Sequence, residues 1–387
     1  MRIAMLAHST HPRGGVVHAM SLAEALTALG HDVVLHAPDA AGTGFFRAPA
    51  CRVAAFPVAP AEPGMTGMVE QRIADYVAYF EAAGTANVDL FHAHDGISAN
   101  ALATLKARGR IPGFVRTVHH IDSFSDPRLM DLQERSIVAA DAHLAVSALW
   151  QGVLRETRGI ATAIVGNGVD LCRFGGTSEA EARSLRRRLG LSPGPVFLSV
   201  GGIEARKNTI RILDAFRQVR AIRPDAQLVI AGGASLLDHR GYQGEFRAAL
   251  GHLGTHQAAV HVLGAVADED MPALYRLSDA LVFASVKEGF GLVVLEAMAS
   301  GLPVVLSSIA PFTEYAGPQD AVWCDPAQPA SIAEAMAVAL MPPVRKRLRP
   351  RGLALAARHG WARVAAAHLP VYRAMRDTLA AKEPLHA

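Results

Sequence analysis

Two carboxylates eight residues apart give this chain its clearest chemical signal. Glu288 opens a glycine-containing turn, and Glu296 follows inside the apolar stretch Leu292–Ser300, which predicts a buried helix. A buried charge is costly unless a partner hydrogen-bonds to it. The vicinal hydroxyls of a ribose would satisfy both oxygens of Glu296, and Glu288 would then bind a second polyol. An ion pair between Glu296 and an arginine or lysine elsewhere accounts for the segment about equally well.

The start of the same helix suits an anion. Its first backbone N–H groups, after Gly291, are free and lie at the positive end of the helix dipole. Gly289 and Gly291 allow a ligand to approach the backbone closely, and Gly301 with Pro303 ends the helix. Contacts for a phosphate, a ribose and a polyol together indicate a nucleotide sugar as the ligand.

A second loop carries adjacent cations. Arg206 and Lys207 follow a predicted strand in the segment Gly201–Asn208 and stand where a helix begins. They could neutralise a diphosphate leaving group. Cations at the start of a helix oppose its dipole, so this placement lowers stability unless an anion joins them. The pattern therefore favours a binding role over a solvated basic helix start.

Glycines after several strands are weaker signals. Gly14 and Gly15 follow the first strand and resemble a phosphate loop, but the third glycine of the dinucleotide fingerprint is absent and a tight turn explains them almost as well. Gly232 with Gly233, and Gly264, end two later strands. They could line a flat base pocket with backbone, although such glycines more often form strand–helix turns.

The histidines at strand ends leave two roles open. His119 could hydrogen-bond a sugar hydroxyl or shield positive charge at the anomeric carbon, or it could simply be satisfied by backbone. His92 and His94 stand two apart, with Asp95 adjacent. A metal site there is conceivable, although no known pattern of metal ligands supports one. We expect no bound metal and no cofactor other than the donor substrate.

Two further segments favour structural roles. Asn167–Asp170 predicts a turn. The basic run between residues 345 and 351 could contact anionic lipid or a phosphorylated acceptor. A charge run is usually a solvated face, and Pro350 is expected to break any long amphipathic helix there. Peripheral membrane contact is therefore not favoured.

Composition limits the class of protein. A chain of 387 residues is longer than one domain with a single hydrophobic core usually is, which predicts two domains. The chain is 51% hydrophobic and 19% charged, which is typical of globular proteins. No apolar run approaches about 20 residues, so we expect no membrane span, and the strand at Arg2–Ala7 leaves no room for a signal peptide. Three scattered cysteines favour free thiols in a reducing cytoplasm. A net charge of +3 argues against nucleic acid as a partner.

Strands alternate with helices in two sets, which predicts two doubly wound parallel sheets, each in a Rossmann-like α/β domain. The strands of the first set are predicted at Ile3–Ala7, Val33–His36, Asp89–His94, Phe114–His119, His143–Ser147 and Ala161–Val165. Those of the second are predicted at Val196–Gly201, Gln227–Ala231, Val260–Leu263, Ala280–Ser285 and Pro303–Ser307.

The domain boundary is predicted from a glycine-rich linker near Cys172–Thr177. It gives an acceptor-side domain at residues 1–174 and a nucleotide-sugar domain at 175–361. The amphipathic last helix, about 362–387, is expected to rejoin the first domain. Ligands of such sheets bind at the carboxyl ends of the strands, so two facing sheets would place the site in a cleft between them.

These motifs together resemble the retaining glycosyltransferases of family four, which have the GT-B fold. The resemblance covers nearly the whole chain. It rests on Gly14-Gly15, T-V-H at Thr117–His119, A-D-A-H-L-A-V-S at Ala140–Ser147, N-G-V-D at Asn167–Asp170, G-G-I-E-A-R-K-N at Gly201–Asn208, A-L-V-F-A-S at Ala280–Ser285 and E-G-F-G-L-V-V-L-E-A-M-A-S-G-L-P-V-V from Glu288. The last run carries the family's hallmark carboxylate pair.

The resemblance implies roles for individual residues. Glu288 would hold hydroxyls of the donor sugar, Glu296 the ribose diol, and Lys207 with a nearby arginine the diphosphate, while His119 would lie near the anomeric centre. Gly202 stands where many members have an arginine, and Arg206 is the candidate replacement. Catalytic roles thus fall on His119, Glu288, Arg206 and Lys207, and donor-binding roles on Gly14, Gly15, Gly202, Gly233, Gly264, Phe290, Gly291, Leu292 and Glu296.

The implied reaction is metal-independent transfer of a sugar, with retention of anomeric configuration, from a nucleoside diphosphate sugar to an unknown acceptor that is a sugar, a small molecule or a lipid-linked group. A hexosyltransferase is expected. The alternatives are a nucleotide-sugar epimerase on the same fold, which would need an acid/base pair at the donor sugar, and a non-catalytic nucleotide-sugar-binding protein, in which the charged residues would have decayed. A nicotinamide dehydrogenase is disfavoured because no complete dinucleotide fingerprint is present.

Overall fold

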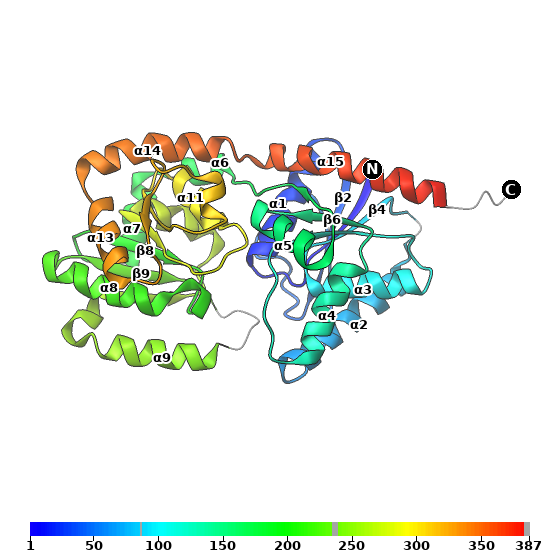
Figure 1. The fold of residues 1–387 in the computed structure, drawn as a ribbon, viewed down its shortest axis with the longest axis horizontal. Helices are drawn as coiled ribbons and strands as arrows, with labels where there is room; N and C mark the ends of the chain where they lie inside the picture. The colour runs from blue at the N-terminus through cyan, green and yellow to red at the C-terminus, as the bar shows by residue number, and fades with distance from the viewer. Residues whose placement is uncertain (86, 234–238, 383–387) are drawn as a thin grey trace. The chain divides into compact units, whose positions relative to one another are not determined.

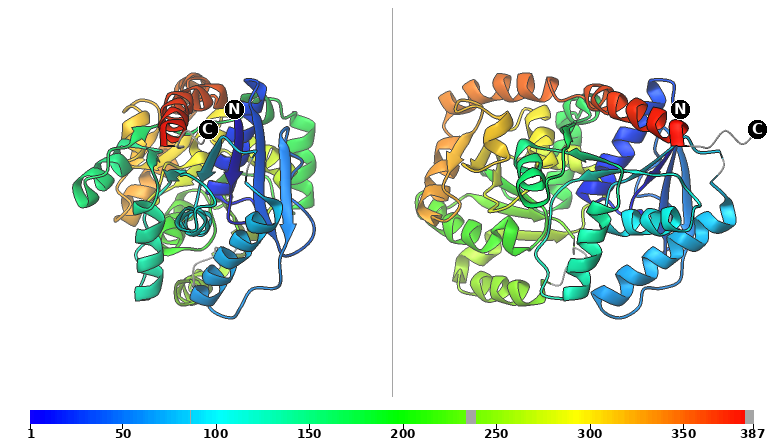
Figure 2. Two further views of the ribbon diagram at one scale, coloured as in Figure 1. Left: turned by 90° about the vertical axis from the view of Figure 1, so that its right-hand side faces the viewer. Right: turned by 45° about the vertical axis from the view of Figure 1, so that its right-hand side comes forward.

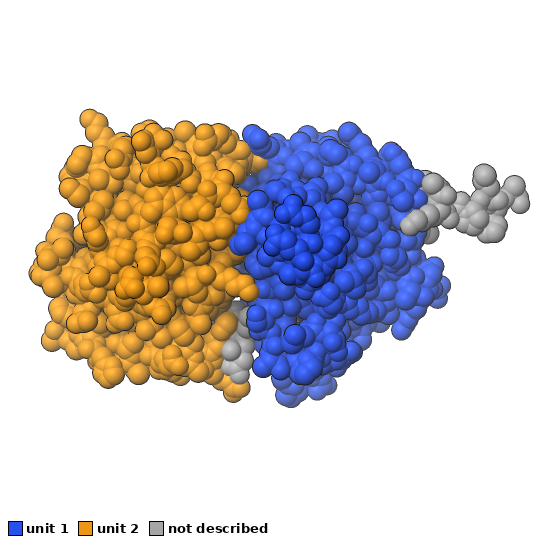
Figure 3. Space-filling model, in the orientation of Figure 1, with its two compact units in different colours: residues 1–168, 361–387 blue, residues 169–360 orange. Residues whose placement is uncertain are grey.

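The chain folds into two compact units, each built around one parallel sheet. The computed structural model describes residues 1–85, 87–233 and 239–382. One unit comprises Met1–Gly168 with Trp361–Ala387, and the other comprises Val169–Gly360 (Figure 3). The division therefore falls at Gly168 and Val169 rather than at 174 and 175, and the predicted linker near Cys172–Thr177 belongs to the second unit.

The described residues of the first unit form seven parallel strands in the order β3-β2-β1-β4-β5-β6-β7 (Figure 1). The strands are β1 (Arg2–Leu6), β2 (Asp32–Asp39), β3 (Arg52–Pro57), β4 (Leu90–Ala93), β5 (Val115–Val118), β6 (Ala142–Ala145) and β7 (Ala163–Ile164). The helices are α1 (Gly14–Ala28), α2 (Met65–Ala83), α3 (Gly96–Ala107), α4 (Pro127–Val138), α5 (Ala148–Arg158) and α15 (Trp361–Lys382). The order reverses between β1 and β4, which makes their carboxyl ends the ligand-binding edge expected of such a sheet.

Alternation along β1 distributes the core of this unit over two faces. Ile3 and Met5 pack with residues of α1 and α15, whereas Ala4 and Leu6 pack with residues of α2 and α3. Because strand side chains alternate between faces, a strand covered on both sides must be apolar throughout. Figure 2 shows helices on both sides of the blue strands.

The described residues of the second unit form six parallel strands in the order β10-β9-β8-β11-β12-β13. The strands are β8 (Val196–Val200), β9 (Gln227–Ala231), β10 (Val260–Gly264), β11 (Ala280–Phe283), β12 (Val304–Ser307) and β13 (Val322–Cys324). The α-helices are α6 (Leu171–Gly175), α7 (Glu179–Arg188), α8 (Thr209–Ile222), α9 (Arg240–Gly251), α10 (Met271–Leu277), α11 (Leu292–Ala299), α12 (Phe312–Tyr315), α13 (Pro329–Ala339) and α14 (Pro342–Ala357). Three short 3₁₀ turns, at Ala205–Lys207, Gly254–Ala259 and Asp268–Asp270, complete it. Here the order reverses between β8 and β11.

Two parallel α/β units confirm the predicted fold class, but β3 and β13 were missed. Both lie at sheet edges. β3 is largely exposed and β13 is three residues long, so neither gives the apolar run of a central strand. The expectation that Pro350 breaks the helix is wrong, because α14 continues through it. A proline removes one backbone hydrogen bond and bends a helix without necessarily ending it.

The last helix, α15, belongs to the first unit, where its apolar residues pack against α1. Residues 383–387 of the predicted segment 362–387 lie outside the described residues. Within the part of the chain that the structure describes, none of the helices has the length and apolar character needed to cross a bilayer.

Candidate functional site

The switch point of the second sheet brings three of the predicted residues together. The loop after β8 carries Arg206 and Lys207, and the loop after the neighbouring β11 carries Glu288. Lys207 Nζ donates to Glu288 Oε1 at 2.7 Å, and Arg206 Nη1 donates to the same oxygen at 3.1 Å. The backbone N–H of Val286 also donates to the carbonyl of Arg206 at 2.9 Å, which ties the two loops together. Two cations and a carboxylate thus share one point at the carboxyl edge of the sheet.

A second carboxylate completes this charge cluster. Glu204, which is only 5% exposed, holds Arg206 Nη2 at 2.9 Å through Oε2. The sequence reasoning missed Glu204, although its position two residues before Arg206 on the same loop was a usable signal. The four side chains carry two positive and two negative charges. Each cation therefore has a protein counterion before any ligand arrives.

Burial and charge act against each other on the two central groups. Burial lowers the pKa of the Lys207 ammonium below its ordinary value, although Glu288 opposes that shift. Burial works to raise the pKa of the Glu288 carboxyl, but Lys207 and Arg206 outweigh it and hold that pKa below its usual value. Lys207 Nζ also lies 4.5 Å from the ring centroid of Phe283, a cation–π contact. Burial thus disfavours the charged form of Lys207, while the two cations favour the charged form of Glu288. Charges in such a poorly hydrated place interact strongly with an anionic ligand.

Glycines at the ends of β8 and β9 pack backbone against backbone. Gly202 has φ +77°, and a Cβ there would lie 2.8 Å from the carbonyl oxygen of Gly233. The N–H of Gly232 donates to the carbonyl of Gly264 at 2.8 Å, while a Cβ on Gly264 itself would meet open space. Gly202 and Gly233 therefore meet directly. Gly264 lies at the end of the next strand, where its φ of +67° favours glycine.

Glu296 lies on α11 and has a different partner from Glu288. Its Oε2 accepts a hydrogen bond from Tyr275 Oη at 2.7 Å. Burial raises the pKa of the Glu296 carboxyl, and burial also raises the pKa of Tyr275 well above its ordinary value. The hydrogen bond that the structure describes for the Glu296 side chain thus comes from a phenol, while the charge of Arg173 nearby acts to lower the pKa of the carboxyl. One carboxylate oxygen is held, which orients the carboxylate without neutralising it.

The start of α11 is shaped by Gly291 and its aromatic neighbours. Gly291 has φ +93°, and a Cβ there would approach Phe312 to 2.9 Å. Gly291 is the N-cap, so the first N–H groups of the helix, which begins at Leu292, have no side-chain cap. The ring of Phe290 stacks on Tyr315 at 4.6 Å between centroids. The predicted anion-binding end is therefore built from backbone held in place by aromatic packing.

The first unit places Gly15 against His119. α1 begins at Gly14, and its N-cap, Arg13, makes no side-chain capping bond. A Cβ on Gly15 would lie 3.7 Å from His119 Cδ2, which is ordinary contact, whereas one on Gly14 would meet nothing within 4 Å. The uncapped start of α1 and the end of β5 thus meet at the carboxyl edge of the first sheet.

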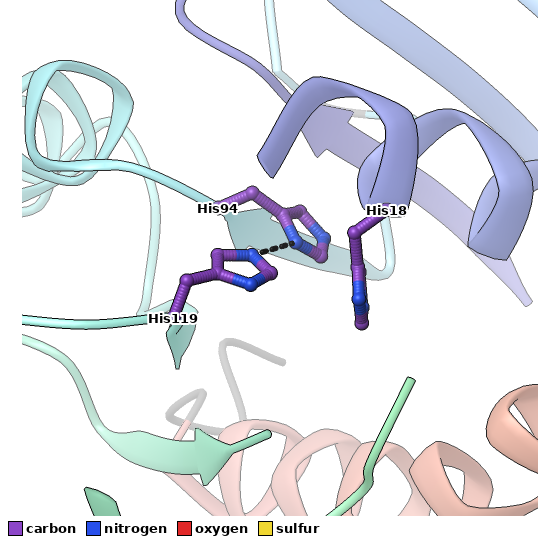
Figure 4. Close-up of side chains that lie close together, drawn as sticks. All are labelled: His18, His94 and His119. Atoms are coloured by element: carbon purple, nitrogen blue, oxygen red, sulfur yellow. Dashed lines mark hydrogen bonds between the residues drawn. The ribbon is translucent and has the colours of Figure 1, made fainter. Parts of the chain in front are cut away.

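His119 is one of three histidines gathered at that edge. One ring nitrogen each of His18, His94 and His119 lies within 4.8 Å of the others (Figure 4). His94 Nδ1 and His119 Nε2 are 3.3 Å apart, and His18 Nδ1 hydrogen-bonds to Asn167 Oδ1. His18 was missed because it stands in the apolar run of α1. Asn167 was predicted only as part of a turn.

His92 and Asp95, which the sequence paired with His94, have separate structural roles. Nε2 of His92 is 2.8 Å from Thr117 Oγ1, and its Nδ1 is 2.7 Å from Tyr372 Oη. Asp95 caps α3, where its side chain accepts from the N–H of Ser98 at 2.8 Å. Both nitrogens of His92 are thus engaged, so the grouping considered from the sequence is replaced by one that includes His18 and His119.

Burial keeps the clustered imidazoles neutral. It lowers the pKa of His18 to about 4, and it lowers the pKa values of His94 and His119 well below the ordinary value. Neighbouring histidines add to the shift for His94 and His119 because a second positive charge close by is unfavourable. At neutral pH all three rings present an unprotonated nitrogen.

Comparison with known families accounts for both halves of the chain. Residues 12–173 match the family described as Glycosyltransferase Family 4. Residues 182–352 match the family described as Glycosyl transferases group 1. The second match contains the charge cluster and α11.

Curated relatives are glycosyltransferases of several kinds. The D-inositol 3-phosphate glycosyltransferase of Salinispora tropica is 32% identical over 310 residues, which are 73% of this chain and 63% of that protein. The O-antigen chain mannosyltransferase B of Escherichia coli is 32% identical over 186 residues, 48% of this chain and 47% of the relative. The chain spans about half the length of the first curated relatives it matches, with shares of 47%, 38% and 54%.

Solved structures match along nearly the whole chain. HepE from Anabaena, solved in complex with UDP-glucose, has a TM-score of 0.78 at 20% identity, covering 97% of this chain and all of that one. Sucrose-phosphate synthase from Thermosynechococcus elongatus has a TM-score of 0.77 at 21% identity, covering 98% of this chain and all of that one. At this identity the likeness establishes the two-unit fold, which is the GT-B fold. With both halves matched to glycosyltransferase families and the fold shared along its length, the chain belongs to the group 1, family 4 glycosyltransferases.

Proposed function

We propose that this protein transfers a hexose from a nucleoside diphosphate sugar to an acceptor hydroxyl, with retention of anomeric configuration and without a metal ion. One observation carries the proposal. Arg206 and Lys207 meet Glu288 at the switch point of the second sheet, and α11, which has no side-chain cap, begins four residues after that carboxylate. That arrangement offers positive charge to a diphosphate and a carboxylate to a sugar. HepE, a structural neighbour, was solved with UDP-glucose, which supports a nucleotide sugar as the donor.

The protein's groups would act on the leaving diphosphate first. Arg206 and Lys207, held in place by Glu288, would neutralise the negative charge that grows as the bond between the anomeric carbon and the diphosphate oxygen breaks. The N–H groups at Leu292 would add the positive end of the α11 dipole. These fixed charges take the part that a divalent cation plays in other phosphate chemistry.

The carboxylates would position the two ends of the donor. Glu288, held in place by Lys207 and Arg206, would accept hydrogen bonds from sugar hydroxyls. Glu296, held by Tyr275 through Oε2, would accept from the ribose diol through its other oxygen. Each carboxylate is therefore oriented by the protein before the donor binds, which reduces the entropy lost on binding.

Retention would follow from attack on the face from which the diphosphate departs. The acceptor oxygen forms the new bond to the anomeric carbon as the bond to the diphosphate breaks. The acceptor's proton passes to the departing phosphate oxygen, so no protein base is needed. We propose that His119 stands near the anomeric centre in this step, as the family resemblance implies.

Two measurements test the proposal in order. A panel of nucleoside diphosphates is first screened for a rise in melting temperature, because a ligand at a hundred times its Kd stabilises the native state by about 2.7 kcal/mol. The sugar derivatives of the stabilising base are then incubated with candidate acceptors, and proton NMR gives the anomeric configuration of the product. Stabilisation by no nucleotide, or a product of inverted configuration, would contradict the proposal.

A further inference from the structure

We propose that His18, His94 and His119 form a binding site for a single divalent transition-metal ion of the zinc class. The site lies wholly in the first unit, at the carboxyl edge of its sheet. His94 and His119 directly follow the ends of β4 and β5, and His18 projects from the second turn of α1 (Figure 4). Imidazole nitrogen is a ligand that zinc, copper, nickel and cobalt share. The three histidines belong to the first unit, whereas the charge cluster of Glu288 belongs to the second.

The spacing of two nitrogens already fits a shared ion. Zinc binds imidazole nitrogen at about 2.0–2.1 Å in tetrahedral geometry, which places two ligand nitrogens about 3.3 Å apart. His94 Nδ1 and His119 Nε2 are 3.3 Å apart. The same distance also allows one ring to donate to the other, so a bound ion would replace this hydrogen bond by two metal–nitrogen bonds.

The third histidine, His18, is oriented for metal binding by a hydrogen bond to Asn167. Nδ1 of His18 pairs with Asn167 Oδ1, and an amide oxygen can only accept, so Nδ1 carries the proton. Nε2 is then the unprotonated nitrogen. It is fully buried, and among the described residues it meets no hydrogen-bond partner. Histidines that bind metals usually hold their other nitrogen in this way.

The electrostatics of the cluster point to the same ligand. Burial keeps all three rings neutral at ordinary pH, as described above. Three protein ligands leave the fourth position of a tetrahedral zinc ion to water or another molecule. The nitrogens lie within 4.8 Å, so binding requires only a small inward shift.

The consequence for activity rests on the proposed function. If His119 serves the donor sugar, an ion on its Nε2 removes it from that role. We therefore infer that zinc inhibits transfer, and that a chelator restores it. Metal binding and nucleotide binding are measured in separate experiments. A negative result for the metal site therefore does not contradict the proposed function, and a negative result for nucleotide binding does not contradict the metal site.

The binding test uses the full chain freed of metal by a chelator. Titration with Co²⁺ is followed by visible absorption, since tetrahedral cobalt absorbs strongly, and titration with Zn²⁺ by competition against a chromophoric chelator. We expect one equivalent of either ion. His18→Gln should weaken binding at least 10-fold, and Asn167→Ala should weaken it about 10- to 100-fold, as loss of an outer hydrogen bond to a ligand does. His36→Asn, a buried histidine of the same unit outside the cluster, is the matched control and should bind as the parent does.

Correct folding of the variants is checked through the second unit. Each variant should keep the melting-temperature rise given by the stabilising nucleoside diphosphate, together with the far-ultraviolet circular dichroism of the parent. The proposal is overturned if the parent binds neither ion stoichiometrically, or if folded His18→Gln and Asn167→Ala bind as tightly as the parent. Those results would mean that the three rings form a hydrogen-bonded polar cluster only.

Discussion

Lys207 and Glu288 form an ion pair of 2.7 Å between the ends of two neighbouring strands, β8 and β11. The pair is nearly buried, with side chains 11% and 7% exposed. A buried pair can be neutral or unfavourable for stability because desolvation offsets its attraction. Its position at the point where the strand order reverses, which is where α/β sheets bind ligands, gives a functional reason for its presence.

Replacement of Lys207 by Met should abolish most of the transferase activity while the fold survives. Loss of one preorganised group that stabilises transition-state charge lowers kcat by about 100- to 1,000-fold. Arg206 still contacts Glu288, so the carboxylate does not become an unpaired buried charge. For each variant, kcat is measured together with the denaturant concentration at the midpoint of unfolding, which reports whether the fold is intact. Lys287→Met, which removes an exposed cation four residues after the end of β11, is the control. Normal turnover by folded Lys207→Met would remove this residue from the diphosphate site.

Glu296 should distinguish ribose from deoxyribose. If its carboxylate accepts from both ribose hydroxyls, the parent protein binds a nucleoside diphosphate more tightly than its 2′-deoxy form. Glu296→Gln should weaken binding of the ribonucleotide about 10-fold, because a hydrogen bond to a charged group contributes about 1.5–3 kcal/mol. It should weaken binding of the 2′-deoxy form less, because only the 3′-hydroxyl remains there as a donor to the carboxylate. Calorimetric Kd values for the four combinations give the coupling directly. Equal losses for both nucleotides would place Glu296 outside the ribose site.

The fold was largely predictable from the sequence because buried parallel strands are continuous apolar runs. The sequence also allowed three site residues to be predicted, because charged residues next to glycines at strand ends have few structural explanations. These residues are Glu288, Arg206 and Lys207. The direct pairing of these side chains could not be predicted, because it depends on β8 and β11 being neighbours in the sheet. Strand order cannot be deduced from the local sequence pattern. His18 was hidden for a related reason. A histidine in an apolar helix looks like any core residue until its neighbours in space are known.

Transfer should proceed in the presence of a metal chelator. Arg206 and Lys207 together with the start of α11 supply the positive charge that a divalent cation would otherwise bring to the diphosphate. EDTA should therefore leave initial rates unchanged, or raise them where zinc has been carried through purification. Added Mg²⁺ or Mn²⁺ should not increase the rate of chelated enzyme. A rate that falls with EDTA and returns with Mg²⁺ would contradict transfer without a metal ion.

The stability of the first unit should fall as the solution is acidified, and His36 allows that to be tested away from the histidine cluster. Burial, with a smaller contribution from Arg52, lowers the pKa of His36 to about 4. In the unfolded chain the same ring has the ordinary histidine pKa of about 6.5, so it is mostly protonated below that pH. The unfolded state therefore binds the proton first, and the contribution of His36 to stability, complete above pH 6.5, is lost as the pH falls toward 4.

The expected size of the effect follows from the same difference in pKa. At pH 5.5, one unit below the ordinary pKa, His36 should destabilise the native state by about 1.4 kcal/mol relative to neutral pH. His36→Asn removes this titration, so the difference in free energy of unfolding between parent and variant should shift by that amount between pH 7.5 and 5.5. His11→Asn, at an exposed position of the same unit, should track the parent at both values. Parallel curves for His36→Asn and the parent would show that His36 is protonated equally in the folded and unfolded chain.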